Sequence, residues 1–309
     1  MRKIMKALLM LISGSMLVPL IGNAQLDMGP DWSAEKQELV ELGLSHGSAW
    51  ELYQYFERNA DDKTLGPDEL PDWTGLWNHA SRGYDNDRYN NGRVGIDALN
   101  AKLKGEYLQM MQEQIDNAAQ GRIWDPHSGC GQARGYPGMI KNNRPHEFAV
   151  TPHQTWHLGQ ARNEVRRIYT DGRGHVPEDW AYDTEHGDTI GFWDGDTLVT
   201  HTMYTNGGWI GRVMPYLSNQ LQGTEVWQLV DENTLQADIW IYDPEALEEP
   251  WFTRHVYHRM HEEPGQPLRL EYWWNCHSPN NMVTPTLGPD GLPDGGTTFL
   301  DFDFTDMDN

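Results

Sequence analysis

The sequence predicts a mainly β protein: an antiparallel up-and-down barrel preceded by an N-terminal helical segment. From Glu147 onward, apolar and polar residues alternate in short runs separated by turn residues, a pattern typical of strands. The stretches WDGD at 193–196 and DEN at 231–233 predict tight turns between antiparallel neighbours. Closure into a barrel would remove the exposed edges of such a series of strands.

The first 24 residues have the pattern of a cleavable secretory signal. Positive charges lie among the first six residues, an apolar run follows at 7–21, and small residues occupy 22–24. The run is short for a membrane span and no stop-transfer charges follow it, which favours a cleaved signal over the alternative, a retained anchor helix. We therefore expect a periplasmic or secreted protein that is not inserted in a membrane after cleavage.

Two further parts follow the predicted signal peptide at 1–24. Residues 25–70 form the N-terminal helical segment, with two short helices expected within 31–61 and a break near Gly47. Residues 71–309 form the barrel domain, which contains an inserted helix near 97–119. Apolar residues fall close to 3.6-residue spacing in that stretch, and such a stripe usually packs into a core.

The charge of the chain excludes some partners. Removal of residues 1–24, which carry three positive and no negative charges, changes the formal net charge from −23 to −26. Such a chain repels nucleic acid and anionic membrane surfaces. No nucleic-acid partner is expected, and the sequence does not predict an oligomeric state.

The two cysteines of the chain are Cys130 and Cys276. In an oxidising compartment such a pair can form one disulfide. Two buried free thiols are the alternative, since sequence alone does not show that the two sulfur atoms meet.

No cofactor or metal is expected from the motifs. The sequence contains no G-x-S-x-G elbow, glycine-rich phosphate loop, dinucleotide-binding fingerprint or C-x-x-C pair. His255 and His258 would lie on opposite faces of one strand, which disfavours joint metal binding. His153 and His157 would suit zinc on a helix, but Pro152 and the β-rich surroundings argue against one. A metal site built from distant segments stays open.

Five motifs follow one another along the chain: DWTGLW at 72–77, EFAVTP at 147–152, VRRIYTDGR at 165–173, TIGFWDGDTLV at 189–199, and DP followed by PW within 243–251. Together they resemble those of a large family of exported bacterial proteins of uncharacterised function. The resemblance covers roughly residues 70–280 and implies a secreted, calycin-like barrel without a settled reaction. The chain departs from the family pattern at His201, where relatives commonly carry aspartate.

His201, Glu225 and His255 are the candidate catalytic residues. Each shares a predicted strand face with large apolar residues, as Glu225 does with Trp227. Burial there would raise the pKa of a carboxyl group and lower that of a histidine. A His–Glu pair could then carry out acid–base chemistry near neutral pH. The alternative is that each is an ordinary core residue whose hydrogen bonds are satisfied.

Arginines and aromatic residues are the candidate binding residues. In a strand at 164–169, Arg166 and Arg167 point to opposite faces, so at least one should enter the barrel or pair with a carboxylate. An inward arginine could hold an anionic group, and a structural ion pair with a barrel acid is the alternative. Tryptophan and tyrosine suit a flat ligand. The predicted binding residues are Arg166, Tyr169, Trp209, Trp227, Trp240 and Tyr257.

Three functions therefore remain, the third being a structural or interaction protein of the cell envelope. The first is a cofactor-independent hydrolase or lyase that acts on a small aromatic substrate, with an ether- or ester-bearing aromatic compound as the most concrete candidate. In it, His201 or His255 moves a proton and Glu225 is the partner of that histidine. The second is a barrel protein that binds a hydrophobic small molecule without chemistry.

Overall fold

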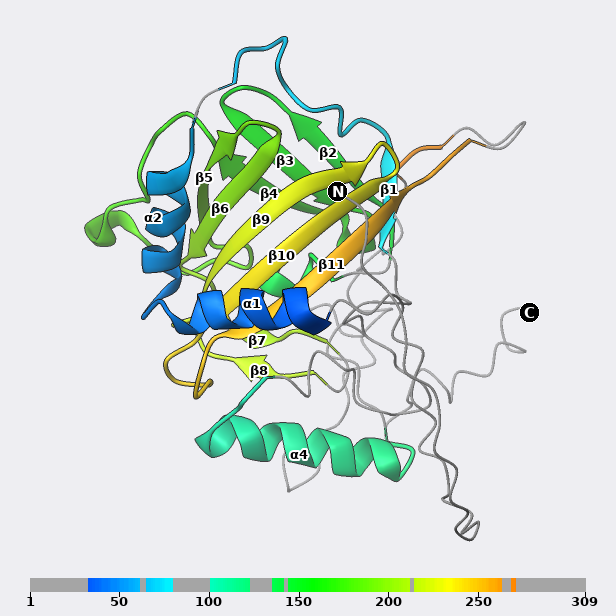
Figure 1. Ribbon diagram of the computed structural model, residues 1–309. Coiled ribbons are helices and arrows are strands. Elements are labelled where there is room, and N and C mark those ends of the chain that lie inside the picture. Colours follow the sequence, from blue (N-terminus) through cyan, green and yellow to red (C-terminus); the bar gives the residue numbers. More distant parts are fainter. Residues whose placement is uncertain are drawn as a thin grey trace, which may run out of the picture.

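The computed structural model describes residues 33–61, 65–79, 101–122, 135–141, 144–211, 214–262 and 268–270 (Figure 1). The predicted signal peptide, both cysteines and the C-terminal tail lie outside these residues, and with them the predicted disulfide. Within the described ranges, no helix combines the length and the apolar character needed to cross a bilayer.

Nine strands close into one barrel, and their order around it follows the chain. Strand β11 pairs with β1 and so completes the ring. Two short strands, β7 (Gly208–Trp209) and β8 (Tyr216–Leu217), pair separately in the connection between β6 and β9. The barrel strands are β1 (Leu76–His79), β2 (His146–Val150), β3 (Gln154–Gly159), β4 (Glu164–Tyr169), β5 (Asp188–Asp194), β6 (Thr197–Met203), β9 (Gln222–Asp231), β10 (Thr234–Tyr242) and β11 (Trp251–Arg259).

The prediction that all strands are antiparallel is wrong at one junction. Strands β4 and β5 run parallel and are paired only at Tyr169 and Ile190. Directions can alternate around a closed ring only when the number of strands is even, and this barrel has nine. The long connection at 170–187 carries the chain back to the start of β5. The predicted hairpin turns at 193–196 and 231–233 are confirmed, since they join β5 to β6 and β9 to β10.

Helices α1 (Ser33–Leu44) and α2 (Ala49–Asn59) lie against the outer face of the barrel (Figure 1). Ser48 caps α2, because its side chain accepts a hydrogen bond from the backbone N–H of Glu51. The hydroxyl of Thr224 on β9 donates to the carbonyl of Ala49 at 2.6 Å. The Thr224 hydrogen bond fixes α2 on β9, and the N–H of Trp240 on β10 donates to the carbonyl of Leu39 on α1.

Helix α4 (Gly105–Ala119) begins later than the apolar stripe near 97–119 suggested. Leu103 instead forms an isolated bridge with Leu247, and Gly105 has a φ of 56°. A left-handed residue does not continue a right-handed helix, so α4 starts at this position. One short helical turn, α5 (Gly135–Gly138), and the 3-10 turns η1 (Ala161–Asn163) and η2 (Glu178–Trp180) complete the described elements.

The barrel has an apolar inner face that also carries charge. Trp77, Trp193 and Trp227 are at most 1% exposed and belong to the inner core cluster. Arg166 and Glu225 are buried among these rings. A second apolar cluster lies outside the barrel, between its wall and the two N-terminal helices. Both faces of the sheet are therefore covered on this side, which allows polar groups to be buried inside and outside the barrel.

Candidate functional site

Arg166 enters the barrel and pairs with Glu225. The alternation predicted for 164–169 is confirmed, with Glu164, Arg166 and Ile168 buried and Val165 and Arg167 exposed. The guanidinium Nη1 and Nη2 donate to Glu225 Oε2 and Oε1 at 3.0 and 2.7 Å. Glu225 thus has an arginine, and not a histidine, as its charged partner.

Neighbouring side chains satisfy the rest of this ion pair. Arg166 Nη2 and Nε donate to the hydroxyls of Thr202 and Thr189 at 2.8 and 3.3 Å. The indole N–H of Trp227 donates to Glu225 Oε2 at 2.6 Å. A buried pair with this many hydrogen bonds holds its charges in place, and the Glu225 carboxylate is 0% exposed.

Aromatic rings enclose the ion pair. The guanidinium carbon of Arg166 lies 4.8 Å from the ring centroid of Tyr136. The Tyr136 hydroxyl lies where Gly223 would carry a side chain, since a Cβ added to Gly223 would be 1.8 Å from it. Tyr257 stacks on Trp227, with centroids 5.7 Å apart. Burial raises the pKa of both tyrosines well above the usual value, so both hydroxyls stay protonated.

Two pairs of histidines line the adjacent part of the barrel. His79 Nε2 lies 2.9 Å from His255 Nδ1, and His146 Nδ1 lies 2.9 Å from His157 Nε2. The ring of Tyr257 is 5.2 Å from those of both His79 and His146. Burial lowers the pKa of His255 to about 3 and that of His157 well below 6.5, so both are neutral at physiological pH. Across the described part of the chain, no three His, Cys, Asp or Glu side chains are placed to hold a metal ion.

His201 lies on the outer face of the barrel, apart from the predicted partner Glu225. Its Nδ1 is 2.7 Å from Nε2 of His175, whose Nδ1 is 2.7 Å from Asp188 Oδ2. The rings of Trp50 and Tyr53 on α2 pack over it at 5.2 and 5.8 Å. Burial lowers the pKa of His201 to about 3. The hydrogen bonds among His201, His175 and Asp188 join the 170–187 connection to β5 and β6, and α2 packs over them.

The structure also separates the predicted binding residues. Arg166, Trp227 and Tyr257 meet inside the barrel, as described above. Tyr169 lies on the outer face of β4. Trp240 is buried outside the barrel and donates its N–H to the carbonyl of Leu39 on α1 at 2.7 Å. Trp209 on β7 packs edge-on against Tyr216, with centroids 5.1 Å apart. The predicted set therefore does not form one site.

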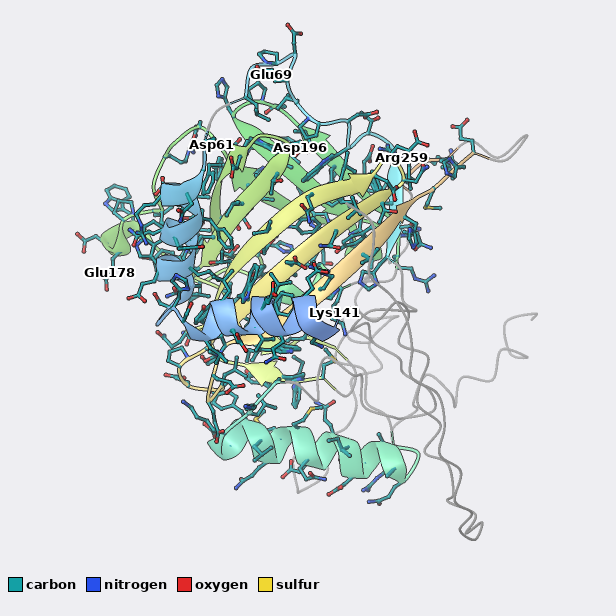
Figure 2. The ribbon with its side chains drawn as sticks, in the orientation of Figure 1. Asp61, Glu69, Lys141, Glu178, Asp196 and Arg259 are labelled. Atoms are coloured by element: carbon teal, nitrogen blue, oxygen red, sulfur yellow. The ribbon has the colours of Figure 1, made fainter. Side chains whose placement is uncertain are left out.

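A cleft opens where β4 and β5 separate. Its volume is about 530 Å³. It lies between the outer face of β4 and the connection at 170–187. The 3-10 turn η2 belongs to this connection and projects from the barrel wall, as the labelled Glu178 shows (Figure 2). The lining residues are Val165, Arg167, Tyr169, Val176, Trp180, Ala181, Tyr182, Thr184, Glu185, His186, Gly187, Asp188, Thr189 and Tyr204.

The cleft exists because the parallel junction is short. A single paired position leaves most of β4 and β5 without a shared ladder, and the connection packs over the gap. Thr189 lines the cleft and also accepts the hydrogen bond from Arg166 Nε, so one residue separates the cleft from the buried ion pair. Tyr204, whose carbonyl accepts the backbone N–H of Thr184 at 3.0 Å, also lines the cleft; its φ of 59° is a strained conformation for a non-glycine residue, of the kind that clusters at ligand sites.

Aromatic rings give the cleft its character. Trp180 and Tyr182 are 79% and 77% exposed, and Tyr169 and Tyr204 complete the aromatic lining. Of these four rings, only Tyr169 is among the binding residues predicted from the sequence. A signal was present, since connections longer than about 12–15 residues are uncommon in compact domains and often carry function.

Comparison with known proteins adds little beyond the barrel itself. No known family model matches the chain, and no curated protein matches it significantly. Crystal structures of two mutants of the fluorescent protein UnaG are similar to it, with TM-scores of 0.28 and 0.26 and sequence identities of 10% and 11%. They cover 62% and 60% of this chain and 97% and 95% of their own. At these TM-scores the likeness carries no argument about ligand or activity. Fold and site together define a closed, mainly β barrel with a cleft in its wall.

Proposed function

We propose that this protein binds a small molecule with a flat ring in the cleft beside β4 and β5. The observation that carries the proposal is the aromatic lining of a cleft of about 530 Å³. This volume is within the range that small-molecule sites occupy. Exposed tryptophan and tyrosine rings are costly in water and stack well on flat ligands, which favours a binding role for Trp180 and Tyr182.

The contacts of the predicted catalytic residues favour binding over chemistry. Glu225 is 0% exposed and is used by Arg166 and Trp227. His255 is held by its contacts with His79 and Thr253 inside the barrel. His201 is covered by α2 and bonded to His175. None of the three lines the cleft. The three predicted catalytic residues therefore do not supply the acid–base groups that a hydrolase or lyase acting in this cleft would need.

The experiment is a ligand search with cleft variants. Purified protein would be incubated with an extract rich in aromatic compounds, and the retained and free fractions would be compared by mass spectrometry. We expect compounds that are enriched on the protein and unchanged in mass. The Trp180→Ala/Tyr182→Ala variant should lose that enrichment. Tyr55→Ala, which removes an exposed ring on α2 outside the cleft, is the matched control.

Each outcome separates the two functions. Enrichment that survives the double substitution would place the ligand elsewhere and refute the proposed site. A compound that disappears while a new mass appears would instead establish an enzyme, and an added water would identify a hydrolase. His201→Ala, His255→Ala and Glu225→Gln would then be assayed for turnover.

A further inference from the structure

The connection at 170–187 and the residue that follows it are strongly acidic. Residues 171–188 contain six aspartate and glutamate residues and one arginine. The arginine, Arg173, is already paired with Asp171, with Nη2 and Oδ2 2.6 Å apart. The wall of the cleft on this side therefore has an excess of negative charge, in a chain whose formal net charge is −23.

Two carboxylates of this segment, Glu185 and Asp188, line the cleft. Asp188 Oδ2 is 2.7 Å from His175 Nδ1 and accepts the backbone N–H of Val176 at 3.0 Å. Burial raises the pKa of Asp188, but these hydrogen bonds outweigh burial and hold it below the usual value. Asp188 is therefore a fixed negative charge in the lining of the cleft.

The basic residues nearby do not cancel this charge. Arg167 also lines the cleft, but its guanidinium carbon lies over the Trp156 ring at 5.3 Å from the centroid. Arg166 is neutralised by Glu225. His186 is neutral at physiological pH, because burial lowers its pKa to about 4. The lining therefore contains two carboxylates and one arginine, so its negative charge exceeds its positive charge.

The rings around the cleft already receive cations. The guanidinium carbon of Arg173 lies 4.1 Å from the centroid of Tyr169 in the lining, and Arg167 of the lining lies over Trp156, a ring that does not line the cleft. Ammonium and guanidinium groups are attracted to the faces of such rings. Trp180 and Tyr182 offer further exposed ring surface to a cation in the cleft.

From these observations we infer that the ligand of the cleft is an amine that carries an aromatic ring, and that its positive charge lies between Glu185, Asp188 and the faces of Trp180 and Tyr182. This inference rests on the proposed function, because it assigns the charge of a ligand in the same cleft. Rings alone would bind neutral and charged flat molecules alike. The combination of rings with fixed carboxylates selects a cation and disfavours an anion.

The test uses three probes that share one phenol ring and differ in charge: tyramine, its alcohol analogue tyrosol, and 4-hydroxyphenylacetate. Binding to the mature chain would be measured by titration calorimetry and by saturation-transfer NMR. Tyramine should bind about tenfold more tightly than tyrosol, and the carboxylate should bind most weakly. Raising the salt concentration should weaken the binding of tyramine more than that of tyrosol.

Variants separate the failure of this inference from that of the proposed function. Glu185→Gln should narrow the difference between tyramine and tyrosol, whereas Asp179→Asn, on η2 but outside the lining, should leave it unchanged. Equal binding of all three probes, lost in Trp180→Ala/Tyr182→Ala, would overturn the charge assignment and keep the ring site. Binding of no probe, or binding unaffected by the double substitution, would overturn both.

Discussion

Arg166 and Glu225 face each other inside the barrel, and two hydrogen bonds of 3.0 and 2.7 Å join the guanidinium to the carboxylate. The two side chains are 1% and 0% exposed. Each charge was removed from water on folding, so each depends on the other for compensation. Strands β4 and β9 are not neighbours in the barrel, and this pair links them through its interior.

Removing one member of this pair should strongly destabilise the fold. Arg166→Met leaves the Glu225 carboxylate buried without its cation, which costs about 3–5 kcal/mol in free energy of unfolding. The double variant Arg166→Met/Glu225→Leu should recover much of that loss, because no buried charge remains. Denaturant unfolding followed by circular dichroism measures both.

The exposed pair of Arg173 and Asp171 supplies the control, with side chains 52% and 27% exposed. Arg173→Met should change stability by less than about 1 kcal/mol. A loss in Arg166→Met as small as this control would show that the interior pair is not desolvated as described.

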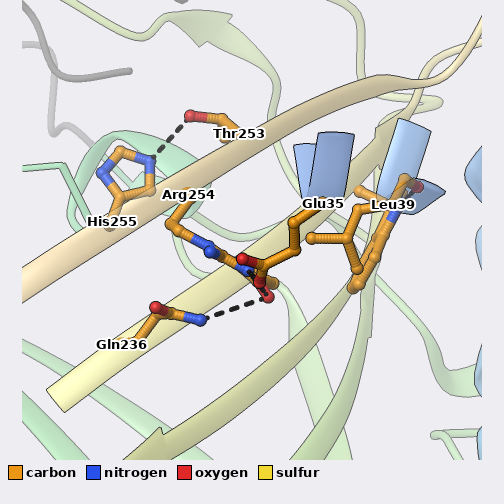
Figure 3. Close-up of polar contacts among 8 residues, drawn as sticks. Glu35, Leu39, Gln236, Thr253, Arg254 and His255 are labelled. Carbon is orange, nitrogen blue, oxygen red and sulfur yellow. Dashed lines mark hydrogen bonds and ion pairs between the residues drawn. The ribbon is translucent and has the colours of Figure 1, made fainter. Parts of the chain in front are cut away.

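Arg254 connects the barrel to α1 through two carboxylates of unequal burial (Figure 3). Asp238 on β10 is 7% exposed and lies 2.5 Å from Arg254 Nε, whereas Glu35 on α1 is 57% exposed at 2.7 Å from Nη2. Asp238→Asn should cost about 3 kcal/mol, because it leaves Arg254 buried without its main partner. Glu35→Gln should cost less than about 1 kcal/mol. Thermal and urea unfolding compare the two, and equal losses would contradict the role of burial.

Acid should destabilise the protein through its buried histidines. The folded-state pKa of both His201 and His255 is lowered to about 3, against an ordinary value of 6.5. Above pH 6.5 both states are neutral and these groups add no pH dependence. Between about pH 6.5 and 3 the unfolded chain binds protons that the folded chain does not. The free energy of unfolding therefore decreases as the pH is lowered, by about 1.4 kcal/mol per pH unit for each histidine.

Substitution of one of these histidines tests the acid effect. His255→Gln should make the free energy of unfolding depend less steeply on pH between pH 4 and 6, because unfolding of the variant takes up about one proton fewer. The exposed His258 lies three residues further along β11, and His258→Gln is the control, with the slope of the parent protein. Parallel curves for His255→Gln and the parent would rule out His255 as a source of the acid sensitivity.

Gly223 should be intolerant of a side chain. Its Cβ would lie 1.8 Å from the Tyr136 hydroxyl, which is buried against Arg166. Gly223→Ala should therefore cost about 1–3 kcal/mol through overpacking, and adding Tyr136→Phe should relieve part of the loss. Gly174→Ala, where no atom lies within 4 Å, is the control. Differential scanning calorimetry measures the shifts, and an unchanged midpoint in Gly223→Ala would contradict the packing.

Much of the barrel could be predicted because local patterns determine it. Alternation at 164–169 placed Arg166 and Arg167 on opposite faces, and the turns at 193–196 and 231–233 joined strands that are indeed neighbours. The site was harder to predict. Period-two alternation places His201 and Glu225 on definite faces of their strands, but does not tell which face is inside.

The sequence by itself determined the alternating strands, the tight turns, the acidic charge and one inward-facing arginine. The tertiary structure decided the rest. Closure of nine strands required one parallel junction, and that junction opened the cleft lined by Trp180 and Tyr182. Packing of α2 on the outer wall buried His201 there, while Arg166 took Glu225 as its partner across the interior. These outcomes depend on which distant segments meet, and alternation within one strand carries no information about that.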